Sequence, residues 1–130
     1  MYRQAMECAD SLRAATIGHQ IVLDLYDCAH ERLDSVDVVR TALIQTARAA
    51  GATIVETVFH KFSPWGVSGV VVIAESHLAI HTWPERRYAA VDIFTCGSSV
   101  DLHRATRYLV QALQAGRAVK KEFPRGSEAA

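Results

Sequence analysis

The sequence has 130 residues, of which 50% are hydrophobic, so it suits one globular domain with its own core and is too short to predict two. Lysine and arginine together number 14, and aspartate and glutamate also number 14, which gives a formal net charge of zero. This balance excludes a general electrostatic attraction for nucleic acid or for an anionic membrane. Residues 1–17 interrupt their apolar positions with charges and predict neither a signal peptide nor a membrane span, so we expect a cytoplasmic protein.

The first half of the sequence predicts a strand, a helix and two more strands. Apolar residues alternate over residues 19–26, as in a half-buried strand. Residues 33–51 carry apolar residues at helical spacing, with Asp34 or Ser35 as the start and Gly51 as the end. Residues 52–62 predict a strand that ends at a Ser-Pro-Trp-Gly turn. The nearly continuous apolar run of residues 67–74 predicts a strand buried on both sides.

The second half predicts two strands, a helix and a last strand. Residues 76–83 alternate, so that His77, His81 and Trp83 share one face, and Pro84 ends this strand. In residues 88–96, Asp92, Phe94 and Cys96 share a face. A helix capped by Ser98 or Ser99 then leads to Gly116, and residues 117–123 could add a strand.

The predicted order of elements is β-α-β-β-β-β-α-β. Strands that follow one another directly favour an antiparallel sheet, and two helices between groups of strands favour a separate helical layer. We therefore predict an α+β fold, a two-layer α/β sandwich with a mainly antiparallel sheet and two helices on one face, formed by residues 1–130 as a single domain.

Polar residues concentrate after the buried strand, in the segment SGVVVIAESHLAIHTWPE of residues 68–85. An acid, a hydroxyl and an imidazole follow one another as Glu75, Ser76 and His77, and His81 comes shortly afterwards. Cys96 lies in the later segment VDIFTCG.

In this order and spacing the residues resemble the self-processing segment of the small prokaryotic S-adenosylmethionine decarboxylases, which are pyruvoyl enzymes made as inactive proenzymes. The resemblance extends from about Gly18 to about Phe123 and is densest from Thr57 to Gly97. The chain also differs from the family pattern in having an extension before Gly18 and a short tail after Phe123, so Met6 is a possible alternative start.

The resemblance implies how the cofactor would arise. Ser76 Oγ would attack the carbonyl of Glu75 to form an ester, and elimination would leave a covalent pyruvoyl group on Ser76 that forms a Schiff base with the substrate. The products would be a β chain of residues 1–75 and an α chain of residues 76–130. His81 matches the processing base, a role that suits imidazole at neutral pH. Ser68 matches the hydroxyl that assists the acyl shift by hydrogen bonding to the oxyanion.

The resemblance also implies the residues that act on the substrate. Cys96 matches the proton donor, since a thiol still holds its proton at neutral pH and releases it readily. Phe62 and Trp83 match positions beside an adenine ring, and Glu85 matches a carboxylate that binds ribose hydroxyls. S-adenosylmethionine is therefore the expected substrate, and its decarboxylated product would serve spermidine synthesis. In the family this site is assembled across a dimer interface, so we expect a homodimer of αβ units or a larger assembly.

Other interpretations remain open at this point. The same fold and pyruvoyl chemistry could act on ornithine or arginine, because the processing residues do not encode the substrate. A non-catalytic paralogue that binds a nucleoside or regulates an active partner is a second alternative. Four histidines suggest a metal, but their spacing matches no zinc motif, and we predict none. The three cysteines, Cys8, Cys28 and Cys96, lack paired spacing, which argues against a disulfide framework.

Overall fold

The computed structural model describes residues 16–126, so Met6 and Cys8 lie outside the described part of the chain. Its strands form one six-stranded sheet in the order β2-β3-β4-β5-β1-β6, and every neighbouring pair is antiparallel. The elements along the chain are β1 (Gly18–Tyr26), α2 (His30–Leu33), α3 (Val36–Ala49), β2 (Ile54–Lys61), β3 (Val67–Ile73), β4 (Ser76–Trp83), the 3-10 helix η1 (Pro84–Arg86), β5 (Tyr88–Cys96), α4 (Leu102–Ala112) and β6 (Arg117–Arg125).

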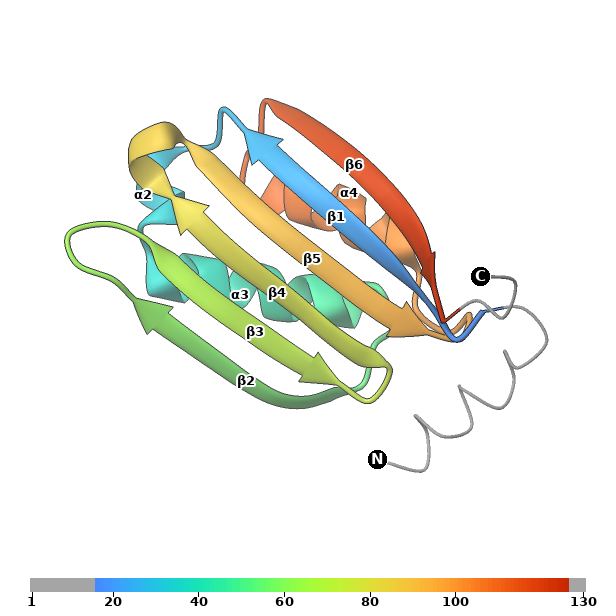
Figure 1. The fold of residues 1–130 in the computed structure, drawn as a ribbon. Coiled ribbons are helices and arrows are strands. Elements are labelled where there is room, and N and C mark those ends of the chain that lie inside the picture. Colours follow the sequence, from blue (N-terminus) through green and yellow to red (C-terminus); the bar gives the residue numbers. More distant parts are fainter. Residues whose placement is uncertain (1–15, 127–130) are drawn as a thin grey trace.

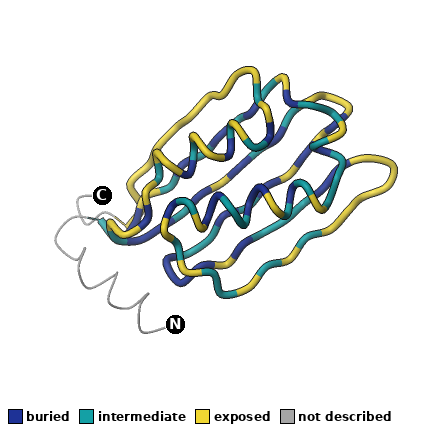
Figure 2. Tube along the Cα trace, turned by 180° about the vertical axis from the view of Figure 1, so that it is seen from behind, coloured by how far each residue is buried: buried dark blue, intermediate teal, exposed yellow. Residues whose placement is uncertain are grey.

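The two long helices, α3 and α4, lie side by side against one face of the sheet (Figure 1), as the view from behind also shows (Figure 2). The predicted two-layer α+β sandwich is therefore confirmed, and so is the predicted order of its main elements. None of the described helices is both long and apolar enough to cross a membrane.

Helix starts follow from local capping. The Ser35 hydroxyl accepts a hydrogen bond from the Val38 amide at 3.2 Å, so Ser35 caps α3 as one of the two predicted residues. The predicted cap of the second long helix was wrong. Asp101 caps α4 instead, because its carboxylate accepts from the Arg104 amide at 3.0 Å, whereas Ser98 and Ser99 lie in the preceding loop.

The hydrophobic core fills the space between the helices and the sheet. Alternate strand residues such as Ile21, Leu78 and Ile93 point into it and are almost fully buried. The prediction that β3 is buried on both sides was wrong. Val71 is buried, but Val72 is 37% exposed, because the described helices cover only one face of the sheet.

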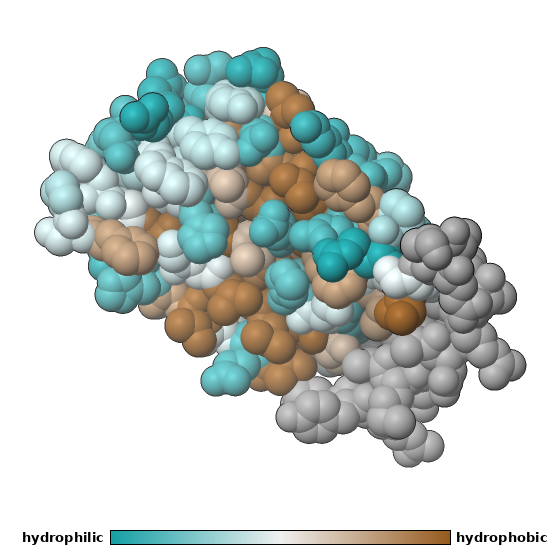
Figure 3. All heavy atoms as spheres, viewed as in Figure 1, coloured by the Kyte–Doolittle hydropathy of each residue, from teal (hydrophilic) through white to brown (hydrophobic). Residues whose placement is uncertain are grey.

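The other face of the sheet, called the outer face below, carries hydrophobic residues between polar ones (Figure 3). Its exposed apolar side chains include Val58, Val72, Trp83 and Phe123. Alternation along β4 and β5 places His77, His81, Phe94 and Asp92 on this face as well. The sequence predicted that His77 and His81 share a face of their strand and that Asp92 and Phe94 share a face of theirs.

Candidate active site

The Glu75–Ser76 peptide bond lies at the tight turn between β3 and β4. Ile73 pairs with Ser76, which leaves Ala74 and Glu75 as the residues of the turn. The φ angle of Ser76 is 144°, in a region that residues with a side chain rarely adopt. Such a backbone costs about 1–3 kcal/mol and persists only where the surroundings hold it. The bond expected to break is therefore next to a strained residue.

The carbonyl expected to be attacked is also held in place. The Cys96 amide donates a hydrogen bond to the Glu75 carbonyl oxygen at 2.9 Å. An amide donor at this position polarises the carbonyl and would stabilise the negative charge that forms there during attack. The Cys96 amide is thus a candidate oxyanion donor. Sequence reasoning missed it, because a motif of side chains does not show which backbone amide will point at a given carbonyl.

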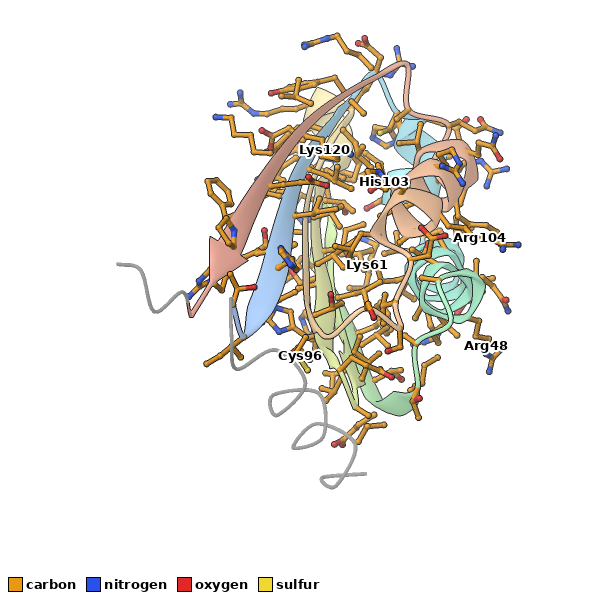
Figure 4. The ribbon with its side chains drawn as sticks, turned by 90° about the vertical axis from the view of Figure 1, so that its right-hand side faces the viewer. Arg48, Lys61, Cys96, His103, Arg104 and Lys120 are labelled. Atoms are coloured by element: carbon orange, nitrogen blue, oxygen red, sulfur yellow. The ribbon has the colours of Figure 1, made fainter. Side chains whose placement is uncertain are left out.

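Cys96 itself ends β5 and is 7% exposed, and Figure 4 shows it on the sheet side of the molecule, away from the helices. Its sulfur takes part in a disulfide bond in this structure, which the odd number of cysteines did not predict. Cys28, by contrast, is a buried free thiol whose pKa is raised to about 11 by burial. Cys28 thus stays protonated at neutral pH, in keeping with a structural role.

Ser68 and His81 form a second group of predicted site residues. They are paired across β3 and β4, and Ser68 Oγ lies 2.7 Å from His81 Nδ1. A hydroxyl and an imidazole in hydrogen-bond contact can exchange a proton, which is what a processing base and its partner require. Both side chains lie on the outer face.

The predicted substrate residues lie with this second group. A pocket of about 310 Å³ is lined by Phe62, Trp83 and Glu85 together with Ser68 and His81. Phe62 is 46% exposed and Trp83 is 40% exposed, so both rings are available for stacking. Trp65 also lines this pocket and was missed by sequence reasoning, although its position in the Ser-Pro-Trp-Gly turn could have suggested it.

Within one chain the structure keeps the two groups apart. Ser76 begins β4 and His81 lies five residues further along it, which corresponds to about 17 Å in an extended strand. Ser68 pairs with His81 and is equally distant. One end of the hairpin therefore carries Glu75, Ser76 and the neighbouring Cys96, and the other end carries the Ser68–His81 pair with the pocket. We call these the cleavage end and the pocket end.

The pocket end is supported by an aspartate in the loop before α3. Asp34 Oδ1 accepts a hydrogen bond from the Gly66 amide at 2.9 Å and lies 3.0 Å from Lys61 Nζ, so it bridges both sides of the loop that carries Phe62 and Trp65. The Gly66 amide, assisted by Lys61, lowers the pKa of Asp34. The ionised carboxylate therefore stabilises the folded form of the loop beside the pocket.

Replacing Asp34 with Ala should loosen this loop. We expect KM to rise about three- to tenfold, with a smaller change in kcat. The rate of self-cleavage should change little, because Ser68 and His81 lie in the paired strands β3 and β4 and not in this loop. Steady-state kinetics of the cleaved protein would measure this. Asp37→Ala is the matched control, since Asp37 forms an exposed ion pair with Arg40 on the surface of α3 and its loss should leave KM unchanged. Folding lowers the pKa of Asp34, so its ionised carboxylate contributes fully to the stability of the folded protein at any pH above its usual pKa of about 3.9. This contribution is lost only as the pH falls through the lower pKa of the folded state.

The remaining histidines do not gather around a possible metal. Among residues 16–126, no three His, Cys, Asp or Glu side chains are close enough together to hold an ion. His60 packs against Phe62 and His77 against Phe94, while His103 Nδ1 lies 3.4 Å from Lys120 Nζ near α4 (Figure 4).

Comparisons with known proteins show the family of this chain. A profile of the family described as S-adenosylmethionine decarboxylase matches residues 19–126. The S-adenosylmethionine decarboxylase proenzyme of Acidithiobacillus ferrooxidans is 53% identical over 111 residues, covering 85% of this chain and 84% of that protein. The proenzyme of the same name from Thermotoga maritima is 50% identical over 111 residues, covering 85% of each.

The fold also matches that of a crystal structure. The adenosylmethionine decarboxylase from Aquifex aeolicus matches with a TM-score of 0.81 and 37% sequence identity, covering 86% of this chain and 92% of that chain. The fold is therefore one that is used by a decarboxylase. The chain belongs to the S-adenosylmethionine decarboxylase family, as the resemblance around Ser76 predicted.

Proposed function

We propose that this protein is a pyruvoyl-dependent S-adenosylmethionine decarboxylase, made as a proenzyme that cleaves itself between Glu75 and Ser76. The observation that carries the proposal, beyond membership of the family, is the strained φ of Ser76 next to a carbonyl that the Cys96 amide already polarises. Its product would be the decarboxylated S-adenosylmethionine used in spermidine synthesis. The cytoplasmic location expected from the sequence is part of this proposal.

Self-cleavage would begin when Ser76 Oγ bonds to the Glu75 carbonyl carbon and its proton passes to a base. The C–N bond then breaks, the nitrogen takes up a proton, and an ester joins the two residues. Loss of the Ser76 Cα proton expels the Glu75 carboxylate and leaves a dehydroalanine, which tautomerises and is hydrolysed with release of ammonia. Because the cut falls in the turn, the strand pairs of β3 and β4 stay intact, and the new chain terminus remains anchored in the sheet.

The residues present fit a pyruvoyl group at position 76. Once formed, this group would supply the carbonyl that binds the substrate amine and accepts the electrons released with carbon dioxide. Cys96 would return a proton to the substrate carbon. Phe62 and Trp83 would hold the adenine ring between their faces, and Glu85 would accept hydrogen bonds from the ribose hydroxyls.

The separation of the two ends supports a homodimer of αβ units. A base about 17 Å away cannot take a proton from Ser76 of its own chain, whereas a second copy could bring its pocket end to the cleavage end. The outer face, which carries Ser68, His81 and exposed Val58 and Val72, offers an apolar surface for that contact. We therefore propose that each complete site takes Ser76 and Cys96 from one copy and His81, Ser68 and the pocket from the other.

Intact-mass measurement of the purified protein would test the proposal. We expect two fragments divided before residue 76, with the C-terminal fragment about 17 Da lighter than its sequence because serine has become pyruvoyl, and reactive toward phenylhydrazine. Carbon dioxide release should then occur with S-adenosylmethionine and not with ornithine or arginine. A single chain that stays intact and does not react with phenylhydrazine would overturn the proposal, and release from ornithine or arginine alone would overturn the substrate.

The redox state of Cys96 should control turnover. A cysteine in a disulfide has no thiol proton to donate, so we expect dithiothreitol to raise decarboxylation several-fold in protein that was isolated oxidised. Self-cleavage should not respond, because the Cys96 amide is present in either state. The control variant Cys28→Ser should show the same response to dithiothreitol, and equal turnover of fully oxidised and reduced protein would argue against Cys96 as the donor.

A further inference from the structure

We propose that Thr53 is a positioning residue for self-cleavage, which fixes the Glu75–Ser76 peptide bond from outside the hairpin. This inference rests on the proposed function. Thr53 precedes β2, so it is separated from the bond by the whole of β2 and β3 in the sequence. The antiparallel pairing of these strands returns the chain to the same end of the sheet and places Thr53 beside the turn.

Thr53 contacts both residues of the turn through three hydrogen bonds. Its carbonyl accepts from the Ala74 amide at 2.8 Å. Its amide donates to Glu75 Oε1 at 3.1 Å, and its hydroxyl donates to Glu75 Oε2 at 3.2 Å. Each oxygen of the Glu75 carboxylate therefore has a Thr53 donor, which restricts rotation of the side chain.

The burial of Glu75 makes these contacts important. Glu75 is 1% exposed, so its carboxylate has lost water and depends on protein donors. Hydrogen bonds to a carboxylate are stronger than those between neutral groups. Thr53 thus anchors the side chain of Glu75, while the Cys96 amide anchors its carbonyl oxygen at 2.9 Å.

These two anchors fix the orientation of the reacting carbonyl. With both held, the plane of the Glu75–Ser76 peptide cannot rotate unless a hydrogen bond breaks, so Ser76 is kept at φ 144°. If the side-chain anchor is lost, the turn can relax and the carbonyl carbon can move away from Ser76 Oγ. Small losses of alignment between reacting atoms reduce rates strongly, by up to about a hundredfold for a displacement near 1 Å.

The substitution Thr53→Val removes the hydroxyl while keeping the shape and the backbone of Thr53. We expect it to slow conversion of the intact chain into two fragments about tenfold, as followed by pulse-labelled in vitro translation and a chase. Thr53→Ser keeps the hydroxyl and should restore the parental rate. Once cleavage is complete, kcat and KM per cleaved chain should match the parent, because Thr53 is assigned no role in turnover.

The matched control is Thr46→Val. Thr46 is also a threonine whose hydroxyl donates to a nearby oxygen, that of Ala42 at 2.7 Å, but it lies within α3. This variant should cleave at the parental rate even if it is less stable, so it separates loss of positioning from loss of stability. Thr53 is exposed, so its substitution opens no core cavity, and Thr53→Ala serves as a second variant without the hydroxyl.

The outcomes distinguish this inference from the function on which it rests. Slow cleavage of Thr53→Val and Thr53→Ala with recovery in Thr53→Ser would support it. Parental rates in both variants, or an equally slow Thr53→Ser, would overturn it while the proposed function stands. A parent chain that never cleaves would overturn both.

Discussion

Chains carrying Ser76→Ala and chains carrying His81→Ala should each be inactive alone, yet produce an active enzyme when the two are co-expressed. Ser76→Ala lacks the attacking hydroxyl and should not cleave, while His81→Ala lacks the processing base and should cleave slowly or not at all. In a mixed dimer, one of the two proposed sites combines an intact Ser76 with an intact His81 from the other copy. That site should cleave and turn over substrate. The decarboxylase activity of the mixed dimer should therefore rise from background to a large part of the activity of one normal site.

The measurement requires mixed dimers purified through two different affinity tags, followed by intact mass and carbon dioxide release. Only the His81→Ala chain should appear as fragments. The matched control combines Ser68→Ala with His81→Ala, two substitutions at the same pocket end, because both sites of that dimer then lack one processing residue. Mixed dimers of the first kind that remain intact and inactive would show that the pocket end acts on its own chain, and that the hairpin must rearrange to do so.

The substitution Cys96→Ala should separate self-cleavage from turnover. Alanine keeps the backbone amide that donates to the Glu75 carbonyl at 2.9 Å but removes the thiol. We therefore expect two fragments and a phenylhydrazine-reactive terminus, but a fall in kcat of about a hundredfold or more, the usual contribution of a positioned proton donor. Intact mass and steady-state kinetics on one preparation would measure both effects.

The opposite pattern would contradict this division of roles. A Cys96→Ala chain that fails to cleave would show that the thiol, rather than the amide, is needed for the acyl shift. A variant that cleaves and retains parental kcat would show that the returning proton comes from another group. Cys28→Ala is the matched control, since Cys28 is a buried thiol with a raised pKa and no proposed chemical role.

The sequence by itself determined the element order, the faces of β4 and β5 and the start of α3. These depend on local patterns, namely side-chain alternation in strands and the hydroxyl of Ser35 at a helix end. It also predicted cleavage at the Glu75–Ser76 bond, because these residues are adjacent in the sequence and can be recognised without knowledge of the fold. Even the distance between Ser76 and His81 was implicit in the predicted strand, since five extended residues span about 17 Å.

Only the tertiary structure decided which distant residues meet. The register of β3 against β4 brings Ser68 to His81, and the path of β2 and β3 brings Thr53 to Glu75. Helices on one face alone left Val72 exposed where the apolar run of β3 had predicted burial on both sides. Sequence spacing measures separation along the chain, whereas strand register and the covering of a face depend on contacts among elements far apart in the sequence.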